Sequence, residues 1–162
     1  MALTAMTPRQ SLLAIAALAI AGVVAALVGQ YGFDMRPCPW CILQRLLFVL
    51  IALLCLLGAL PGSRAAQRAA AGSVVLVAAL GIAAALWQHF VAAKSTSCNL
   101  TFADKLLNAL HVESLSPELF GITGSCADAK VDLIGVPFEF WSLALFVVLA
   151  GLAVNALRGR AA

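Results

Sequence analysis

Four long apolar stretches dominate the pattern of hydrophobic and polar positions along the chain. They cover residues 12–28, 42–60, 73–91 and 138–157, and apart from Arg45 and Glu139, each near one end of a stretch, they contain no charged residue. A helix needs about 20 apolar residues to cross about 30 Å of hydrocarbon. Uninterrupted Leu, Ala, Val and Ile also lack the alternation of a membrane-spanning strand. The pattern predicts an all-α membrane protein, a bundle of four transmembrane helices in a single domain.

The first stretch has an alternative interpretation as a cleaved signal peptide, because Arg9 precedes it and small residues end it. The apolar core of a signal peptide is usually only about 7–15 residues long, which is shorter than this run. Cleavage would also leave three helices and put the two remaining charge-biased ends on opposite sides of the membrane. We therefore expect the first stretch to be a transmembrane helix.

Composition agrees with a lipid environment and excludes other classes of protein. The chain has 162 residues, of which 64% are hydrophobic and 10% are charged, and its mean hydropathy is +1.05. Average soluble domains are about 45–50% apolar and about 25% charged. The net charge of +3 comes without a basic block, so we expect no nucleic-acid binding. The excess apolar surface is expected to contact membrane lipid.

Charge placement predicts how the chain is oriented in the membrane. Arginines and no acidic residues occur before the first helix, in the link 61–72 and after the fourth helix. The acidic residues all belong to the other two connections or their edges: Asp34, Asp104, Glu113, Glu118, Asp128, Asp132 and Glu139. By the positive-inside rule, both termini and the middle link face the cytoplasm, while residues 30–41 and 92–137 face outward. We expect Glu139 to stay at the outer surface.

The longer outward connection contains one amphipathic segment. Phe102, Leu106, Leu107 and Leu110 recur at helical spacing with polar residues between them. This spacing predicts a short helix on the membrane surface. The alternative is an amphipathic turn in a flexible loop.

Four of the five cysteines lie in the two outward connections. Cys38 and Cys41 occupy the first and Cys98 and Cys126 the second, while Cys55 lies within the second apolar stretch. Disulfides persist outside the reducing cytosol, so this placement suits a redox-active or disulfide-bonded exterior. We expect Cys55 to pack as a small apolar residue.

The Cys38-Pro39-Trp40-Cys41 segment has three possible roles: thiol–disulfide exchange, a structural disulfide, or half of a zinc site. Zinc would need a second close pair of ligands, which the chain lacks, so no metal is expected. Pro39 disfavours helix up to Cys38, so the second helix is predicted to begin near Trp40 or Cys41. The amino end of a helix favours a thiolate, which supports exchange.

Two further side chains are candidates for the same site. Arg45 lies one turn beyond Cys41 on the same helix face, where it would stabilise an anion or extend to the lipid headgroups. His89, at the outer end of the third helix, would line the same pocket or be an ordinary helix-end residue. Gln44 and Trp40 give weaker signals for the same pocket. Replacement of Arg45 is expected to weaken acceptor use and to leave thiol exchange intact.

The four outward cysteines predict a relay of electrons. A soluble dithiol would reduce Cys98–Cys126, which would pass the electrons to Cys38–Cys41 through mixed disulfides. The chain has no Gly-rich nucleotide-binding turn and no CxxCH haem motif. A quinone dissolved in the bilayer is the electron acceptor that fits the location of Cys41 and Arg45.

With these features the chain resembles the disulfide bond formation protein B (DsbB) family of bacterial inner membranes. The resemblance implies a quinone-dependent thiol–disulfide oxidoreductase that reoxidises DsbA, a soluble thioredoxin-like partner. It implies that DsbA attacks Cys98, that Cys126 communicates with Cys38, and that Cys41 faces ubiquinone or menaquinone. Arg45 and His89 would match residues associated with the quinone. Gln44 is a departure, because the best-known member of the family carries an acidic residue there.

Three other classes of protein remain as alternatives. A non-enzymatic, tetraspanin-like scaffold would carry stable loop disulfides, but it leaves the pairing of CxxC with Arg45 unexplained. A reductase similar to vitamin K epoxide reductase would place its CxxC by the last helix, where this chain has no cysteine. A zinc-holding membrane protein would be revealed by bound metal.

Overall fold

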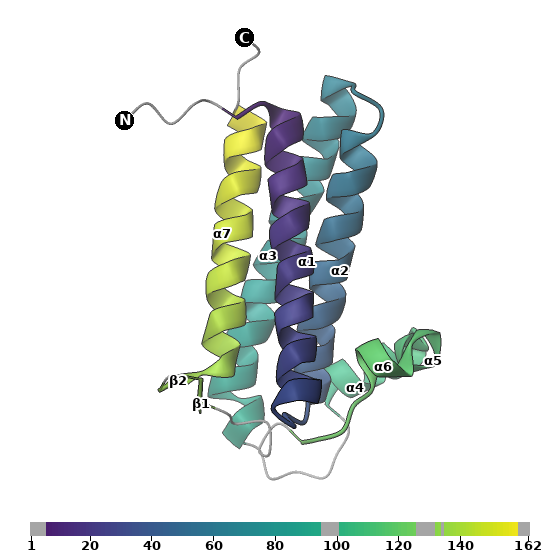
Figure 1. The fold of residues 1–162 in the computed structure, drawn as a ribbon, viewed down its shortest axis with the longest axis vertical. Helices are drawn as coiled ribbons and strands as arrows, with labels where there is room; N and C mark the ends of the chain where they lie inside the picture. The colour runs from purple at the N-terminus through teal and green to yellow at the C-terminus, as the bar shows by residue number, and fades with distance from the viewer. Residues whose placement is uncertain (1–5, 95–100, 126–131, 134, 159–162) are drawn as a thin grey trace.

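Four long helices form the body of the protein (Figure 1). The computed structural model describes residues 6–94, 101–125, 132–133 and 135–158. The long helices are α1 (Pro8–Gly32), α2 (Pro39–Ala59), α3 (Arg64–Phe90) and α7 (Phe138–Arg158). All four are long and apolar enough to cross a membrane. The predicted all-α bundle of four membrane helices is confirmed.

Two of these helices begin well before their apolar stretches. α1 starts at Pro8, where Thr7 and Gln10 form a capping box, and α3 starts at Arg64 after the N-cap residue Ser63. A capping side chain satisfies backbone amides that the first helical turn leaves unpaired. Helix therefore extends through polar turns that hydropathy alone does not mark.

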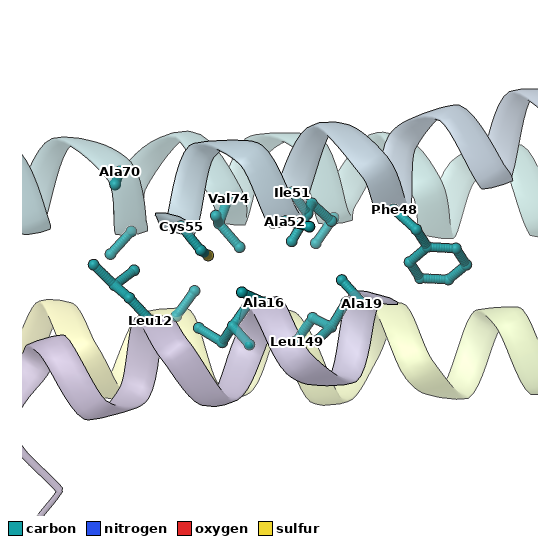
Figure 2. Close-up of a cluster of buried hydrophobic side chains, with 14 of the residues drawn as sticks. Leu12, Ala16, Ala19, Phe48, Ile51, Ala52, Cys55, Ala70, Val74 and Leu149 are labelled. Atoms are coloured by element: carbon teal, nitrogen blue, oxygen red, sulfur yellow. The ribbon is translucent and has the colours of Figure 1, made fainter. Parts of the chain in front are cut away.

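The main core lies along the bundle axis, where all four long helices meet. Figure 2 shows Leu12 and Ala16 of α1 facing Cys55 of α2 and Val74 of α3. Cys55 is fully buried in this cluster, which confirms that it packs as a small apolar residue. Phe48 also stacks on Phe146 of α7, with ring centroids 4.1 Å apart. The core holds the four helices together.

The outside of the bundle is also apolar. Large hydrophobic side chains on all four long helices are exposed, among them Leu13, Val24, Leu57, Leu76, Leu80, Val147 and Val148. In water such a surface would favour aggregation. Lipid is the solvent in which it is stable.

Shorter helices lie near one end of the bundle, most of them to one side of it (Figure 1). They are η1 (Ala92–Lys94), α4 (Phe102–Ala109), α5 (Val112–Leu115) and α6 (Pro117–Phe120). α4 is the predicted amphipathic helix. Its Ala103 and Leu107 are buried in a second cluster with Ile42 of α2, whereas Phe102 and Leu110 are exposed. Part of its apolar face therefore packs on the bundle end.

A small hairpin leads into α7. β1 (Asp132–Leu133) and β2 (Val136–Pro137) are antiparallel, with Leu133 opposite Val136, and Gly135 adopts a φ of +76° in the turn. The sequence predicted no strands. Two residue pairs are too few to give a periodic signal.

Close packing of α3 on α7 depends on Gly81. A Cβ at this position would collide with the Phe146 ring. We expect Gly81→Ala to destabilise the protein by about 1–3 kcal/mol, because the ring would have to move within a packed core. Thermal unfolding in detergent measures the change. Gly72→Ala on the same helix is the control, since nothing lies within 4 Å of a Cβ there, and it should be neutral or slightly stabilising.

Candidate functional site

The CxxC segment forms the first turn of α2. Cys38 is the N-cap residue, and its sulfur accepts a hydrogen bond from the backbone amide of Cys41. Pro39 is the first helical residue, slightly earlier than predicted, and its fixed φ suits that position. The Sγ atoms of Cys38 and Cys41 lie 2.8 Å apart, compared with about 2.05 Å in a disulfide. Cys38 is fully buried, whereas Cys41 is partly exposed.

Backbone of the second outward connection docks beside this turn. The amides of Thr123 and Gly124 both donate to the carbonyl of Pro37, each over 3.2 Å. A Cβ at Gly124 would lie 2.9 Å from the Cβ of Arg36, so glycine permits the approach. The two outward connections therefore meet next to Cys38.

Cys98 and Cys126, the other two predicted redox residues, lie outside the described residues. In sequence, Cys126 follows Gly124 by two positions. The docked backbone thus lies within three residues of Cys126 in sequence.

Arg45 points inward and is 4% exposed. Its Nη1 donates to Gln30 Oε1 over 2.8 Å and to the carbonyl of Leu119 over 2.5 Å. Its Nε is buried and has no hydrogen-bond partner among the described residues. Nearby, the Tyr31 hydroxyl donates to the carbonyl of Glu118 over 2.8 Å. Arg45 therefore does not extend to the headgroups, and together with Tyr31 it tethers α6 to the bundle.

A cavity of about 390 Å³ opens beside Cys41 and Arg45. Apolar residues of α1, α2 and α7 form most of its wall, and polar side chains enter from the helix turns at the end that carries α4 to α6. The lining includes Leu18, Gly22, Ala26, Gln30, Cys41, Gln44, Arg45, Phe48, Gln88, Glu139, Trp141 and Leu145. This combination of apolar walls and a few convergent polar groups is typical of small-molecule sites.

His89 does not line the cavity, but its partner does. His89 Nδ1 lies 2.8 Å from Glu139 Oε1, and the side chains are 30% and 6% exposed. Glu139 lies in the first turn of α7, at the same end of the bundle as the CxxC turn, but it is buried and not on the surface as expected, because its side chain meets His89 of α3 and lines the cavity. His89 thus connects a cavity carboxyl group to a more exposed position.

Sequence reasoning missed five polar residues of the cavity wall: Gln30, Arg36, Gln88, Glu139 and Ser142. Polar and ionisable side chains within apolar stretches are functional candidates by default, and this signal applied to Gln88 and Glu139. Gln44 lines the cavity, whereas Trp40 belongs to the second cluster and is in ring contact with the exposed Trp87 and Phe102.

The family described as Disulfide bond formation protein DsbB matches residues 8–156. The chain belongs to the DsbB family. A disulfide bond formation protein B of Herminiimonas arsenicoxydans is 31% identical over 143 residues, which cover 88% of this chain and 90% of the relative. A disulfide bond formation protein B 1 of Pseudomonas syringae pv. syringae is 35% identical over 142 residues, which cover 86% of this chain and 82% of the relative. A protein B of Burkholderia pseudomallei is 32% identical over 154 residues, or 94% and 91%.

Membership in the DsbB family makes the chain a disulfide oxidoreductase that acts in disulfide bond formation. Its four apolar helices make it a multi-pass membrane protein. These findings favour the oxidoreductase over the non-enzymatic scaffold. The CxxC turn, in which Cys38 is buried and Cys41 is partly exposed, adjoins the cavity.

Proposed function

We propose that this DsbB-family protein reoxidises a DsbA-like dithiol partner and transfers the two electrons to ubiquinone or menaquinone. The observation that carries the proposal is the cavity between the membrane helices, whose wall contains both Cys41 and Arg45. A hydrophobic acceptor that diffuses in the bilayer would reach such a cavity between helices. A soluble cofactor would need a binding site outside the membrane.

The cavity residues fit a quinone head group. Its ring is flat and apolar, matching the walls formed by Phe48, Trp141 and Leu145. Its two oxygens accept hydrogen bonds, and Arg45 is a buried cation whose Nε donor has no described partner. Arg45 and the apolar wall would hold the group, with the Cys41 sulfur beside it.

When bound, a quinone would supply an acceptor for two electrons and two protons. Arg45 would stabilise negative charge that develops next to Cys41. Glu139 would hold a proton at Oε1 and exchange it with Nδ1 of His89, which is partly exposed. The cavity therefore combines a reactive sulfur, a fixed cation and a proton-carrying pair.

Thiol–disulfide exchange accounts for the remaining steps. The partner's two thiols become a disulfide as Cys98–Cys126 is reduced, and reduced Cys98–Cys126 in turn reduces Cys38–Cys41. The bonds from Thr123 and Gly124 to Pro37 support exchange between Cys126 and Cys38, because they hold the second connection beside the CxxC turn. Each cycle oxidises two thiols and releases two electrons and two protons.

The charge distribution supports a bacterial inner-membrane location with both termini in the cytoplasm. Arg9, Arg64, Arg68 and Arg158 lie at the end of the bundle where α1 begins and α7 ends (Figure 1). CxxC, α4 and Glu139 lie at the opposite end. This asymmetry follows the positive-inside rule and would put the redox cysteines in the periplasm.

Filling the cavity tests the proposal. Purified protein in detergent, supplied with a reduced thioredoxin-like dithiol, should reduce ubiquinone. Ala26→Phe should lower kcat/KM for the quinone about tenfold or more, mainly through KM, because the new ring occupies the cavity. Dithiol exchange with the cysteine pairs should be unchanged.

Ala17→Phe is the matched control, since Ala17 lies on α1, is exposed and does not line the cavity. Normal quinone kinetics in Ala26→Phe would show that the acceptor binds elsewhere. Failure of the unmodified chain to reduce any quinone would contradict the proposed function itself.

A further inference from the structure

A pair of buried amides connects α2 and α3 beside the reactive sulfur. Gln44 and Gln88 are 3% and 5% exposed. Gln44 Nε2 donates to Gln88 Oε1 over 2.7 Å, and Gln88 Nε2 donates to Cys41 Sγ over 3.4 Å. The three side chains thus form a directed chain of hydrogen bonds that ends on Cys41.

The direction of these hydrogen bonds affects the protonation state of Cys41. A thiolate only accepts hydrogen bonds, whereas an amide donates through nitrogen alone. When the carbonyl oxygen of Gln88 accepts from Gln44, the amide nitrogen of Gln88 is directed toward the sulfur. Gln44 therefore determines which end of Gln88 faces Cys41.

We propose that Gln88 is the side-chain donor that stabilises the Cys41 thiolate during exchange, and that Gln44 is the positioning residue that orients it. Among the described residues, the side-chain atoms bonded to Cys41 Sγ are Cys38 Sγ and Gln88 Nε2. Cys38 has no S–H to donate once its sulfur is in a mixed disulfide. Gln88 keeps its donor throughout the cycle.

This inference rests on the thiol chemistry of the family and is independent of the proposed quinone. Arg45 is closer in sequence, but its Nη1 is bonded to Gln30 and Leu119. Among the described residues, the other charged or titratable groups around Cys41 and the cavity are the N-cap residue Cys38, Arg45 of α2, His89 of α3, Glu139 of α7, Tyr31 of α1 and Arg36 before α2. The test variants leave all of these in place.

Alkylation of reduced protein by iodoacetamide, without quinone, tests the role of Gln88. The thiolate is the reactive form of cysteine, so the rate at Cys41, assigned by peptide fragmentation, reports its thiolate fraction. In Gln88→Met, which keeps the length but removes the donor, the rate at pH 7 should fall about tenfold, within the range of a hydrogen bond to a charged group. At high pH, where the Cys41 thiol is fully ionised in both proteins, their alkylation rates should converge.

The matched control is Gln67→Met, which replaces a buried glutamine in the first turn of the same helix and should leave the rate at Cys41 unchanged. Cys55 is an internal control for folding, because a fully buried thiol should stay unreactive in every variant. Equal rates of Cys41 alkylation at pH 7 in Gln88→Met and in the unmodified protein would overturn the proposal. An alkylation rate that is lower by the same factor at every pH would also overturn it, because such a change would reflect poorer access of iodoacetamide to the sulfur and not a smaller thiolate fraction.

Gln44→Glu tests the orienting role without touching Cys41. A carboxylate at this position only accepts, so the Gln88 amide should rotate and turn its carbonyl oxygen toward the sulfur. The rate at pH 7 should fall by about tenfold, as in Gln88→Met. In the double variant Gln44→Glu/Gln88→Met, the rate should match that of Gln88→Met alone.

Additive effects in the double variant would indicate a direct effect of the new charge and would contradict the orienting role. These measurements also separate the inference from the proposed function. If Gln88→Met is alkylated normally and quinone reduction is intact, only the inference about Gln88 is rejected. If Gln88→Met is alkylated slowly but the unmodified chain reduces no quinone, only the proposed use of quinone as electron acceptor is rejected.

Discussion

Cys41→Ser should abolish quinone reduction while leaving the protein folded. Cys41 lines the cavity, and its sulfur lies 2.8 Å from the Cys38 sulfur, so it is the described cysteine that both meets Cys38 and lines the cavity. A serine hydroxyl neither forms a disulfide nor ionises at neutral pH. We expect the rate with a reduced dithiol partner to fall about 1,000-fold or more, as for loss of an essential nucleophile.

Cys55→Ala is the matched control for this prediction. It removes a cysteine of the same helix that lies in the main core (Figure 2) and does not line the cavity. Its quinone reduction should stay within about twofold of the unmodified rate, with some loss of stability from the smaller side chain. Substantial residual turnover in Cys41→Ser would mean that another sulfur delivers the electrons.

Arg45→Met should slow quinone reduction about 100-fold, which is the effect of removing one buried donor that stabilises developing negative charge. The same change should slow exchange between the cysteine pairs about fivefold, because Arg45 also holds the carbonyl of Leu119. This second effect differs from the expectation based on sequence, in which exchange stays intact. Stopped-flow measurement of each half-reaction resolves the two effects.

Tyr31→Phe separates the two roles of Arg45. It removes the other tether to α6, the bond to the Glu118 carbonyl, from a side chain that does not line the cavity. Exchange should slow slightly, and quinone kinetics should be unchanged. Quinone kinetics that remain normal in Arg45→Met would remove Arg45 from the acceptor site.

Much of the architecture is encoded locally in the sequence. Four apolar stretches predicted four membrane helices because the bilayer core requires about 20 apolar residues in each crossing. The amphipathic spacing of residues 102–110 predicted α4 for a similar reason. Pro39 placed Cys41 in the first turn of α2. The helix starts at Pro8 and Arg64 were not predicted, because they depend on capping side chains within polar turns.

The cavity site was predicted only in part. The sequence pointed to Cys41 and Arg45 because they lie on one helix, one turn apart. It did not point to Gln88 as a donor, since Gln44 and Gln88 are 44 positions apart, nor to Glu139, which lies 50 positions from His89. Residues on different helices meet only after the bundle packs.

The sequence by itself therefore determined the membrane-helix architecture, the position of the CxxC segment at a helix start and the separation of charges between the two ends of the bundle. The tertiary structure decided which polar side chains share the cavity, that Arg45 binds α6, and that Glu139 is buried. The difference is physical. Helix formation and lipid burial depend on neighbours within a few residues, whereas the cavity depends on the rotation and depth of four helices, which are set by close contacts such as Gly81 against Phe146.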